Sequence, residues 1–238
     1  ALVPVFDFIG GDILIGNPDL DITSIHNYDL RWEWFPKPAE VLAASLFYKT
    51  LSSPIEKQFV TANRQVQYQN RDEAIVYGLE LEARKSLETI SENLSDFTVG
   101  GNFTYVVSEV NVTPFEYEFG RNETRQLAGQ SPYIMNFDIS YNNDRTGTIV
   151  SLFYNIFGPR LAVVGSSSPA RPNAFEQPVG TLDLTISQSL SDHWKLKFSA
   201  KNLLDPTVDV TQEFGGQEYI YSSYKRGRSF GMSLSYDF

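Results

Sequence analysis

The last ten residues of the chain, 229–238, alternate between apolar and small polar side chains without interruption. Successive side chains of a strand point to opposite faces, so this pattern predicts a strand with one apolar and one polar face. Such a strand needs an apolar medium on one side and water or polar protein on the other. A transmembrane β-barrel supplies both environments. The apolar row consists of Phe230, Met232, Leu234, Tyr236 and Phe238.

The same alternation recurs upstream, which distinguishes a barrel wall from a single amphipathic edge strand. Two less regular segments, 41–49 and 148–157, also have strand-like patterns. The segments predict about nine strands, each near the roughly 9–11 residues that a tilted strand needs to cross a bilayer. We therefore expect an all-β protein, a transmembrane antiparallel β-barrel wall. The other regular segments are 27–34, 75–87, 97–108, 135–141, 182–187 and 194–201.

The connections between these segments alternate in length. Outer-membrane barrels have short turns on the periplasmic side and long loops on the extracellular side. Both series of connections agree with a final strand that ends in the periplasm. The short connections are 36–40, 88–95, 142–147 and 190–193, and the long ones are 51–74, 111–130, 158–178 and 205–222.

Composition excludes several other classes of protein. Aromatic residues make up 14% of the chain, as expected where rings form girdles at both membrane interfaces. The absence of cysteine excludes disulfide scaffolds and cysteine-based metal sites or nucleophiles. No run approaches about 18 apolar residues, which excludes a helical membrane protein. The net charge of -10 argues against nucleic acid as a partner, because no basic stripe is present to neutralise phosphates.

A series of motifs follows in a fixed order along nearly the whole chain. The motifs are NPDL at 17–20, NYDL at 27–30, SLFYKTLSSPIEK at 45–57, VYGLELEARKSL at 76–87, GNFTYVVSEV at 101–110, RQLAGQSPYIMNFDISY at 125–141, SLFYNIFGPRLAVVG at 151–165, LDLTISQSL at 182–190, KFSAKNLLDP at 197–206 and the terminal GRSFGMSLSYDF. In content and order this series resembles the middle-to-late barrel of TonB-dependent outer-membrane receptors.

The resemblance implies a barrel of about 22 strands whose lumen holds an N-terminal plug. Receptors of this family import scarce large nutrients, such as siderophore-iron or cobalamin, with energy from the TonB–ExbB–ExbD complex. We expect residues 1–16 to be the end of an extracellular loop and residues 17–238 to form about nine C-terminal wall strands. The plug and the N-terminal strands are expected in a preceding part of the protein. The expected partners are these parts, outer-membrane lipid, TonB–ExbB–ExbD, the metal-chelate or other nutrient ligand, and the barrel-assembly machinery, which would read the terminal apolar row as its signal.

The polar rows of the predicted strands carry charged side chains that we expect to face the lumen. A charge costs about 2–4 kcal/mol on the lipid face near the midplane, but little toward a wet interior. These residues either form ion pairs that hold a plug and solvate the channel or line a substrate pathway. They are Arg31, Glu33, Glu80, Glu82, Arg84, Lys195 and Lys197.

The long loops are where we expect substrate to bind. The segment 115–119 (FEYEF) is interpreted as a hairpin extended above the membrane or as an aromatic platform for a ligand. Arginine and tyrosine side chains in these loops would hold an anionic or aromatic ligand. The candidate substrate-binding residues are Phe115, Tyr117, Phe119, Arg121, Arg125, Arg160, Arg171, Tyr219, Tyr221 and Tyr224.

Catalysis finds little support in the sequence, and we expect no enzyme activity. The two histidines, His26 and His193, lie near opposite ends of the predicted strands, whereas a Ser-His-Asp site needs hydrogen-bonded neighbours. The histidines share no metal-ligand spacing with a carboxylate cluster. We therefore expect no cofactor and no resident metal, and any iron would arrive inside a chelator.

Two alternatives of other classes remain. A passive porin or structural outer-membrane barrel would share the wall pattern but lack a plug. A soluble carbohydrate-binding β-sandwich would account for four Asn-X-Ser/Thr triplets, yet Asn and Thr two residues apart also share the polar face of a strand, as do Asn102 and Thr104. A sugar-importing receptor paired with a surface lipoprotein is a variant of the main interpretation, but the terminal segment resembles the general receptor branch more closely.

Overall fold

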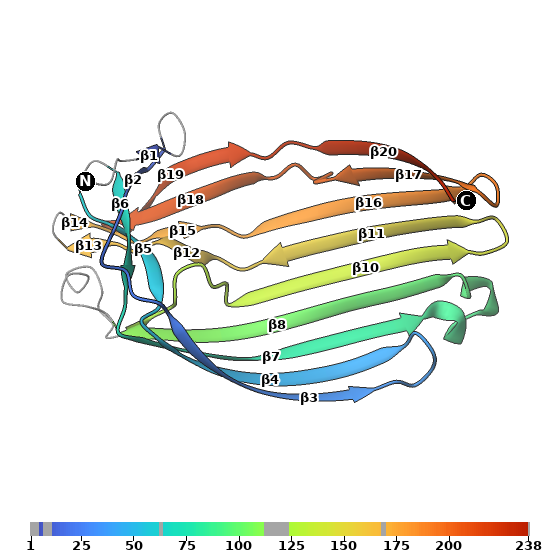
Figure 1. Cartoon of the computed structure of the whole chain (residues 1–238), viewed down its shortest axis with the longest axis horizontal. Coiled ribbons are helices and arrows are strands. Elements are labelled where there is room, and N and C mark those ends of the chain that lie inside the picture. Colours follow the sequence, from blue (N-terminus) through green and yellow to red (C-terminus); the bar gives the residue numbers. More distant parts are fainter. Residues whose placement is uncertain (1–4, 7–10, 62–63, 112–123, 168–169, 238) are drawn as a thin grey trace.

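The computed structural model describes residues 5–6, 11–61, 64–111, 124–167 and 170–237. Within these residues, nine long strands lie side by side in one sheet, in the order β20-β17-β16-β11-β10-β8-β7-β4-β3 (Figure 1). The prediction of a wall of about nine antiparallel strands is therefore confirmed. The wall strands are β3 (Ser24–Trp34), β4 (Val41–Ser52), β7 (Glu73–Ser86), β8 (Phe97–Asn111), β10 (Tyr133–Asn143), β11 (Thr148–Phe157), β16 (Val179–Ser189), β17 (Trp194–Lys201) and β20 (Ser229–Tyr236).

Apolar side chains form continuous rows across one face of this wall. Trp32 lies opposite Ala44, Ala44 opposite Leu81, and Leu81 opposite Phe103. Because a strand alternates its faces with a period of two, a register in step keeps every apolar residue on the same side. The rows predicted from alternation within single strands thus join into one apolar surface.

The wall is a single layer, and none of the other residues that the structure describes pack over its apolar face. Leu30 is 69% exposed, Phe230 64% and Met232 77%. Exposed apolar area on this scale is unfavourable in water and favourable against hydrocarbon. The wall therefore satisfies the physical requirement of a transmembrane barrel, with the opposite face toward the lumen.

The two ends of the wall differ, as Figure 1 shows. At one end, named the turn end here, short connections join consecutive strands, and one of them carries the 3-10 helices η1 (Leu87–Thr89) and η2 (Glu92–Leu94). No helix in the described ranges is long and apolar enough to cross a membrane. The long connections all lie at the other end, named the loop end.

The long connections were expected to be loops, but they contain strands. They pair with one another because backbone groups above the wall must also find hydrogen-bond partners. One sheet has the order β1-β2-β6-β5, a second β12-β15-β18-β19, and β13 pairs with β14 while β9 pairs with β8. These strands are β1 (Val5–Phe6), β2 (Ile13–Ile15), β5 (Ile55–Phe59), β6 (Gln65–Asn70), β9 (Thr124–Arg125), β12 (Arg160–Val163), β13 (Ser166–Ser167), β14 (Ala170–Arg171), β15 (Ala174–Glu176), β18 (Thr207–Phe214) and β19 (Gln217–Lys225).

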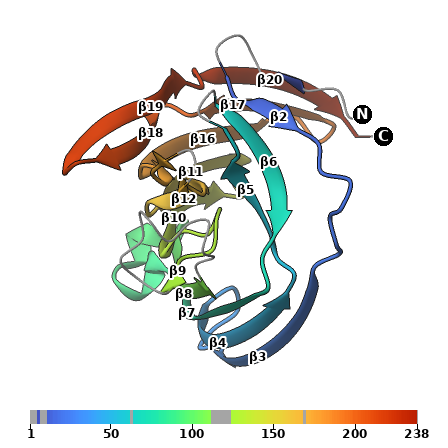
Figure 2. The same ribbon diagram turned by 90° about the vertical axis from the view of Figure 1, so that its left-hand side faces the viewer.

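The buried hydrophobic cluster lies at the loop end, where the two small sheets meet. Phe59 and Val66 from the first sheet are 0% exposed and pack with Val163 and Ala174 from the second. Viewed from the loop end, the wall curves as an arc and β5 and β6 lie on its concave side (Figure 2). The loop-end strands thus form a packed structure over the wall.

Candidate functional site at the loop end

Strand β5 is the element on which the candidate site is built. It pairs with β6 along one edge and forms a parallel bridge between Gln58 and Val164, the residue that follows β12. The N–H of Phe59 donates to the Val164 carbonyl at 3.1 Å, and the N–H of Val164 donates to the Lys57 carbonyl at 2.9 Å. These two bonds join the two loop-end sheets directly.

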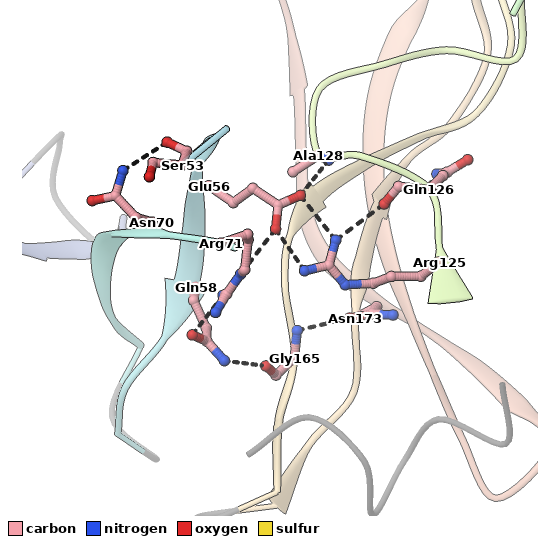
Figure 3. A network of polar contacts seen from close by, with 10 residues as sticks. All are labelled: Ser53, Glu56, Gln58, Asn70, Arg71, Arg125, Gln126, Ala128, Gly165 and Asn173. Atoms are coloured by element: carbon pink, nitrogen blue, oxygen red, sulfur yellow. Dashed lines mark hydrogen bonds and ion pairs between the residues drawn. The ribbon is translucent and has the colours of Figure 1, made fainter. Parts of the chain in front are cut away.

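One face of β5 carries a buried carboxylate, that of Glu56, whose side chain is 0% exposed. Arg125 donates Nη1 to Oε1 at 2.8 Å and Nη2 to Oε2 at 2.6 Å, and Arg71 donates Nε to Oε2 at 3.0 Å (Figure 3). The backbone N–H of Ala128 donates to Oε1 at 2.7 Å. A buried charge is tolerated only when it is paired and hydrogen-bonded in this way.

The same network reaches a third connection through Gln58. Arg71 Nη2 donates to Gln58 Oε1 at 2.7 Å, and Gln58 Nε2 donates to the Gly165 carbonyl at 3.1 Å (Figure 3). The Gly165 N–H donates to Asn173 Oδ1 at 2.7 Å. Three of the long connections are therefore linked through the Glu56 face of one short strand.

Electrostatics favour the charged form of Glu56. Burial by itself raises the pKa of this carboxyl, but the hydrogen bond and charge of Arg125, the Ala128 N–H and the charge of Arg71 together outweigh burial and hold its pKa below the ordinary value. Removing one partner of a buried pair of this kind costs about 3–5 kcal/mol. The network is thus a strong structural constraint at neutral pH.

The opposite face of β5 borders a cavity of about 430 Å³ at the loop end, named here the loop-end cavity. Its polar residues are Asp12, Lys57, Arg64, Tyr221, Ser222 and Tyr224, and its apolar residues include Ala162, Val163 and Val210. It lies between the two small sheets, beside the hydrophobic cluster.

Two cations in the cavity share a single carboxylate. Lys57 Nζ lies 2.6 Å from Asp12 Oδ2, and Arg64 Nε lies 3.7 Å from Asp12 Oδ1. Tyr221 donates its hydroxyl to Asp12 Oδ1, and the Arg64 guanidinium lies 4.2 Å from the centre of the Tyr221 ring. The cluster has one more positive than negative charge and presents an aromatic face, which suits an anionic or aromatic ligand.

Two features mark the cavity as constrained. Arg64 has a φ of 57°, in the left-handed region that costs a residue other than glycine about 1–2 kcal/mol. Such local strain is concentrated at functional sites. Burial, together with the hydrogen bond to Asp12, raises the pKa of Tyr221 to about 12, so its hydroxyl stays a donor at neutral pH.

The structure distributes the candidate substrate-binding residues over different surroundings. Tyr221 lines the loop-end cavity, as does Tyr224. Arg125 is bound to Glu56, whereas Arg160 donates Nε to Glu176 Oε2 at 2.8 Å.

The remaining candidates lie elsewhere at the loop end. The Arg171 guanidinium lies 4.7 Å from the centre of the Phe59 ring. Tyr219 is 52% exposed and donates its hydroxyl to Gln217. Phe115, Tyr117, Phe119 and Arg121 lie outside the described residues.

The predicted substrate-binding residues did not include Asp12, Lys57 or Arg64. The short segments on either side of residues 60–64 alternate, which is a readable hairpin signal. Alternation does not reveal, however, that this hairpin meets Asp12 and Tyr221, and Tyr221 lies 157 residues from Arg64.

Ion pairs lie on the polar face of the wall, one within β3 and one that reaches from β3 across β4 to β7. Arg31 Nε lies 2.6 Å from Glu33 Oε1, and Arg31 Nη2 lies 2.7 Å from Glu82 Oε2. These side chains are about 40% exposed, so each pair contributes only about 0.2–1 kcal/mol. By register, Glu80, Arg84, Lys195 and Lys197 lie on the same side of the wall.

The ion pairs continue into a row of amides across the middle of the wall. Asn136 Nδ2 donates to Asn102 Oδ1 at 2.7 Å, and Asn155 Nδ2 donates to Asn136 Oδ1 at 2.6 Å. At the last strand, β20, all four described residues of the terminal apolar row are exposed, and Phe238 lies outside the described residues.

A single antiparallel sheet with an exposed apolar face, a polar face of ion pairs and amides, and folded connections at one end is the wall of a transmembrane β-barrel. The chain belongs to the TonB-dependent receptors. Its residues 5–203 match the family described as TonB dependent receptor-like, beta-barrel. A search of curated proteins finds no match to this chain.

Solved receptors share the fold. The ferric enterobactin receptor PfeA of Pseudomonas aeruginosa, in complex with enterobactin, is 18% identical with a TM-score of 0.60, over 95% of this chain and 33% of that one. The ferric yersiniabactin uptake receptor FyuA of Yersinia pestis is 16% identical with a TM-score of 0.60, over 91% of this chain and 30% of that one. The copper transporter OprC is 14% identical with a TM-score of 0.64, over 93% of this chain and 32% of that one. The chain thus spans about one third of the length of these proteins.

Proposed function

We propose that the chain is the C-terminal part of the wall of a bacterial outer-membrane receptor that imports a scarce large nutrient with energy delivered through TonB. The nutrient class is a ferric siderophore, cobalamin or a similar ligand. Family membership supports this proposal, and so does the likeness of fold to receptors named for ferric siderophores. In this proposal the loop end faces the cell exterior, as long barrel loops do.

In this orientation the two parts of the chain have different places in the barrel. Residues 1–16 serve as the end of an extracellular loop, and residues 17–238 supply wall strands. A plug and further strands, from another part of the protein, complete the barrel. The partners are outer-membrane lipid, the barrel-assembly machinery and, through the plug side, TonB–ExbB–ExbD.

The loop-end cavity is the observation that carries the proposal. The two positive charges of Lys57 and Arg64 exceed the single negative charge of Asp12. The side chains of Tyr221 and Tyr224 border the same cavity. Such a cavity is suited to one planar, anionic group of a larger ligand. Further contacts with that ligand are still predicted for Phe115, Tyr117, Phe119 and Arg121.

The first experiment tests uptake by the full-length receptor in a strain that lacks its own copy. The probes are iron-labelled enterobactin, iron-labelled yersiniabactin and cobalamin. For whichever probe is imported, Arg64→Ala should raise the concentration for half-maximal uptake roughly 10- to 150-fold, because a hydrogen bond to a charged group contributes about 1.5–3 kcal/mol. The matched control is Arg226→Ala, at an exposed arginine outside the cavity. Equal uptake by the two variants would remove the cavity from the ligand site.

A second arm tests the source of energy. Uptake of the same probe is measured in cells with and without TonB. Loss of uptake without TonB supports an energised importer. Uptake that persists unchanged would instead support a passive porin.

A further inference from the structure

Strand β5 separates two sets of contacts on its two faces. Glu56 and Gln58 point into the buried polar network (Figure 3). Lys57 lines the loop-end cavity, and Phe59 belongs to the hydrophobic cluster. Successive side chains of a strand leave on opposite faces, so any displacement of the first set moves the second. Both sets lie on a single strand of five residues.

We propose that Glu56 is a positioning residue for the loop-end cavity: its carboxylate draws Arg71 and Arg125 together and thereby holds Lys57 of β5 at the distance from Asp12 and Tyr221 that ligand binding requires. The ligand-binding part of this inference rests on the proposed function. The positioning part concerns only how the loop-end sheets are joined.

The charge balance around Glu56 supports this role. The charged groups that face it are Arg71, at the end of the β5–β6 hairpin, and Arg125, on β9. Their side chains are 5% and 10% exposed. Without the carboxylate, two guanidinium groups would face each other with little water to screen them, which separates the elements that carry them.

Loss of the Glu56 charge is expected to open the junction between the two loop-end sheets. β5 meets the residue that follows β12 through the bridge at Gln58 and Val164, so the amides of Phe59 and Val164 report whether the two sheets are joined. The Gln58 amide, held between Arg71 and the Gly165 carbonyl, depends on the same arrangement. Loss of the Glu56 charge should therefore expose both reporter amides to exchange.

Acid should have the same effect as removing the charge. The pKa of Glu56 lies below its ordinary value of 4.5, so the carboxylate stabilises the junction above that value, and its contribution is lost as pH falls through the lower pKa of the folded state.

The test is hydrogen exchange of the full-length receptor in lipid, followed by mass spectrometry of peptides that cover residues 55–60 and 161–166. In Glu56→Gln the protection of these peptides should fall at least tenfold, while Glu56→Asp, which keeps the charge, and the exposed control Glu213→Gln should retain it. The central part of wall strand β4 serves as the internal standard. Unchanged protection in Glu56→Gln would overturn the inference.

Two further measurements, an acid titration and an uptake assay, complete the test. If Glu56→Gln fails to assemble, acid titration of the unaltered receptor replaces it: protection should be lost at the two peptides before the wall, and simultaneous loss would refute the positioning role. Uptake is measured on the same variants. Loss of protection with unchanged uptake would leave the sheet junction assigned to Glu56 but overturn the link to ligand binding, whereas a loss of both supports the whole inference.

Discussion

Gly78, in the middle of β7, offers the sharpest test of how the wall is packed. Its neighbours across the sheet are Phe47 on β4 and Val106 on β8. A Cβ added at Gly78 would overlap the carbonyl oxygen of Tyr105 and approach Phe47 Cζ to 2.5 Å. The ring can rotate, but the carbonyl belongs to the backbone of β8. Gly78→Ala therefore cannot be accommodated without a shift between β7 and β8.

The size of the effect follows from that geometry. Overpacking that forces the backbone to move costs about 1–3 kcal/mol. The matched control is Gly231→Ala on β20, where the added Cβ would meet only Ser199 Oγ, at 2.9 Å. A hydroxyl can turn away, so this substitution should change stability by less than about 0.5 kcal/mol.

The assay is urea unfolding of the full-length receptor in lipid or detergent, followed through tryptophan fluorescence and through the gel mobility of the folded barrel. Gly78→Ala should shift the unfolding midpoint to lower urea and Gly231→Ala should not. The double variant Phe47→Leu with Gly78→Ala should recover only part of the loss, because it relieves the ring contact and leaves the carbonyl overlap. Equal midpoints for the two alanine variants would refute this account of the β7–β8 packing.

Two other predictions concern the last strand and the cavity. Leu234→Arg, on the apolar face, should cost about 2–4 kcal/mol and lower the fraction of receptor inserted in membranes, while Ser233→Arg, on the polar face, should insert normally; equal insertion would reverse the assigned faces. Because the pKa of Tyr221 is raised to about 12, its hydrogen bond to Asp12 should persist as the pH passes 10 and be lost as the pH approaches 12. Ultraviolet titration of the unaltered receptor, with that of Tyr221→Phe subtracted, should show this step. A midpoint near 10 would contradict the buried geometry.

Alternation predicted the wall well because two different media act on its faces, and the exceptions have local causes. In β4, Ala43 falls on the polar face, where it lies opposite Glu33 and Glu82 and is 2% exposed. Phe47 falls on the same face, where it covers Gly78. Both residues broke the pattern in the segment 41–49. Their positions depend on side chains of neighbouring strands, which no pattern within one strand can report.

The loop end was less predictable for a different reason. In β5, alternation puts Ile55, Lys57 and Phe59 on one face and Glu56 and Gln58 on the other. Alternation would expose to water a strand face that carries a charged and a polar side chain. Both Glu56 and Gln58 are nevertheless buried. The decisive partner, Arg125, is 69 residues away along the chain. A buried ion pair depends on both of its residues, and the sequence around either residue does not indicate which residue is its partner.

The order of the wall strands has a consequence for how such a chain can change. Every wall strand pairs with the next wall strand along the sequence, so each connection at the loop end only has to close a local gap. The entropic cost of closing a flexible loop rises slowly, by about 0.6 kcal/mol of free energy for each doubling of the loop length. Insertions above the wall therefore cost little, while a single inserted residue within a wall strand would reverse every side chain beyond it. The fold thus leaves the loop end free to diversify in length and content while it restricts the membrane-spanning strands to substitution alone.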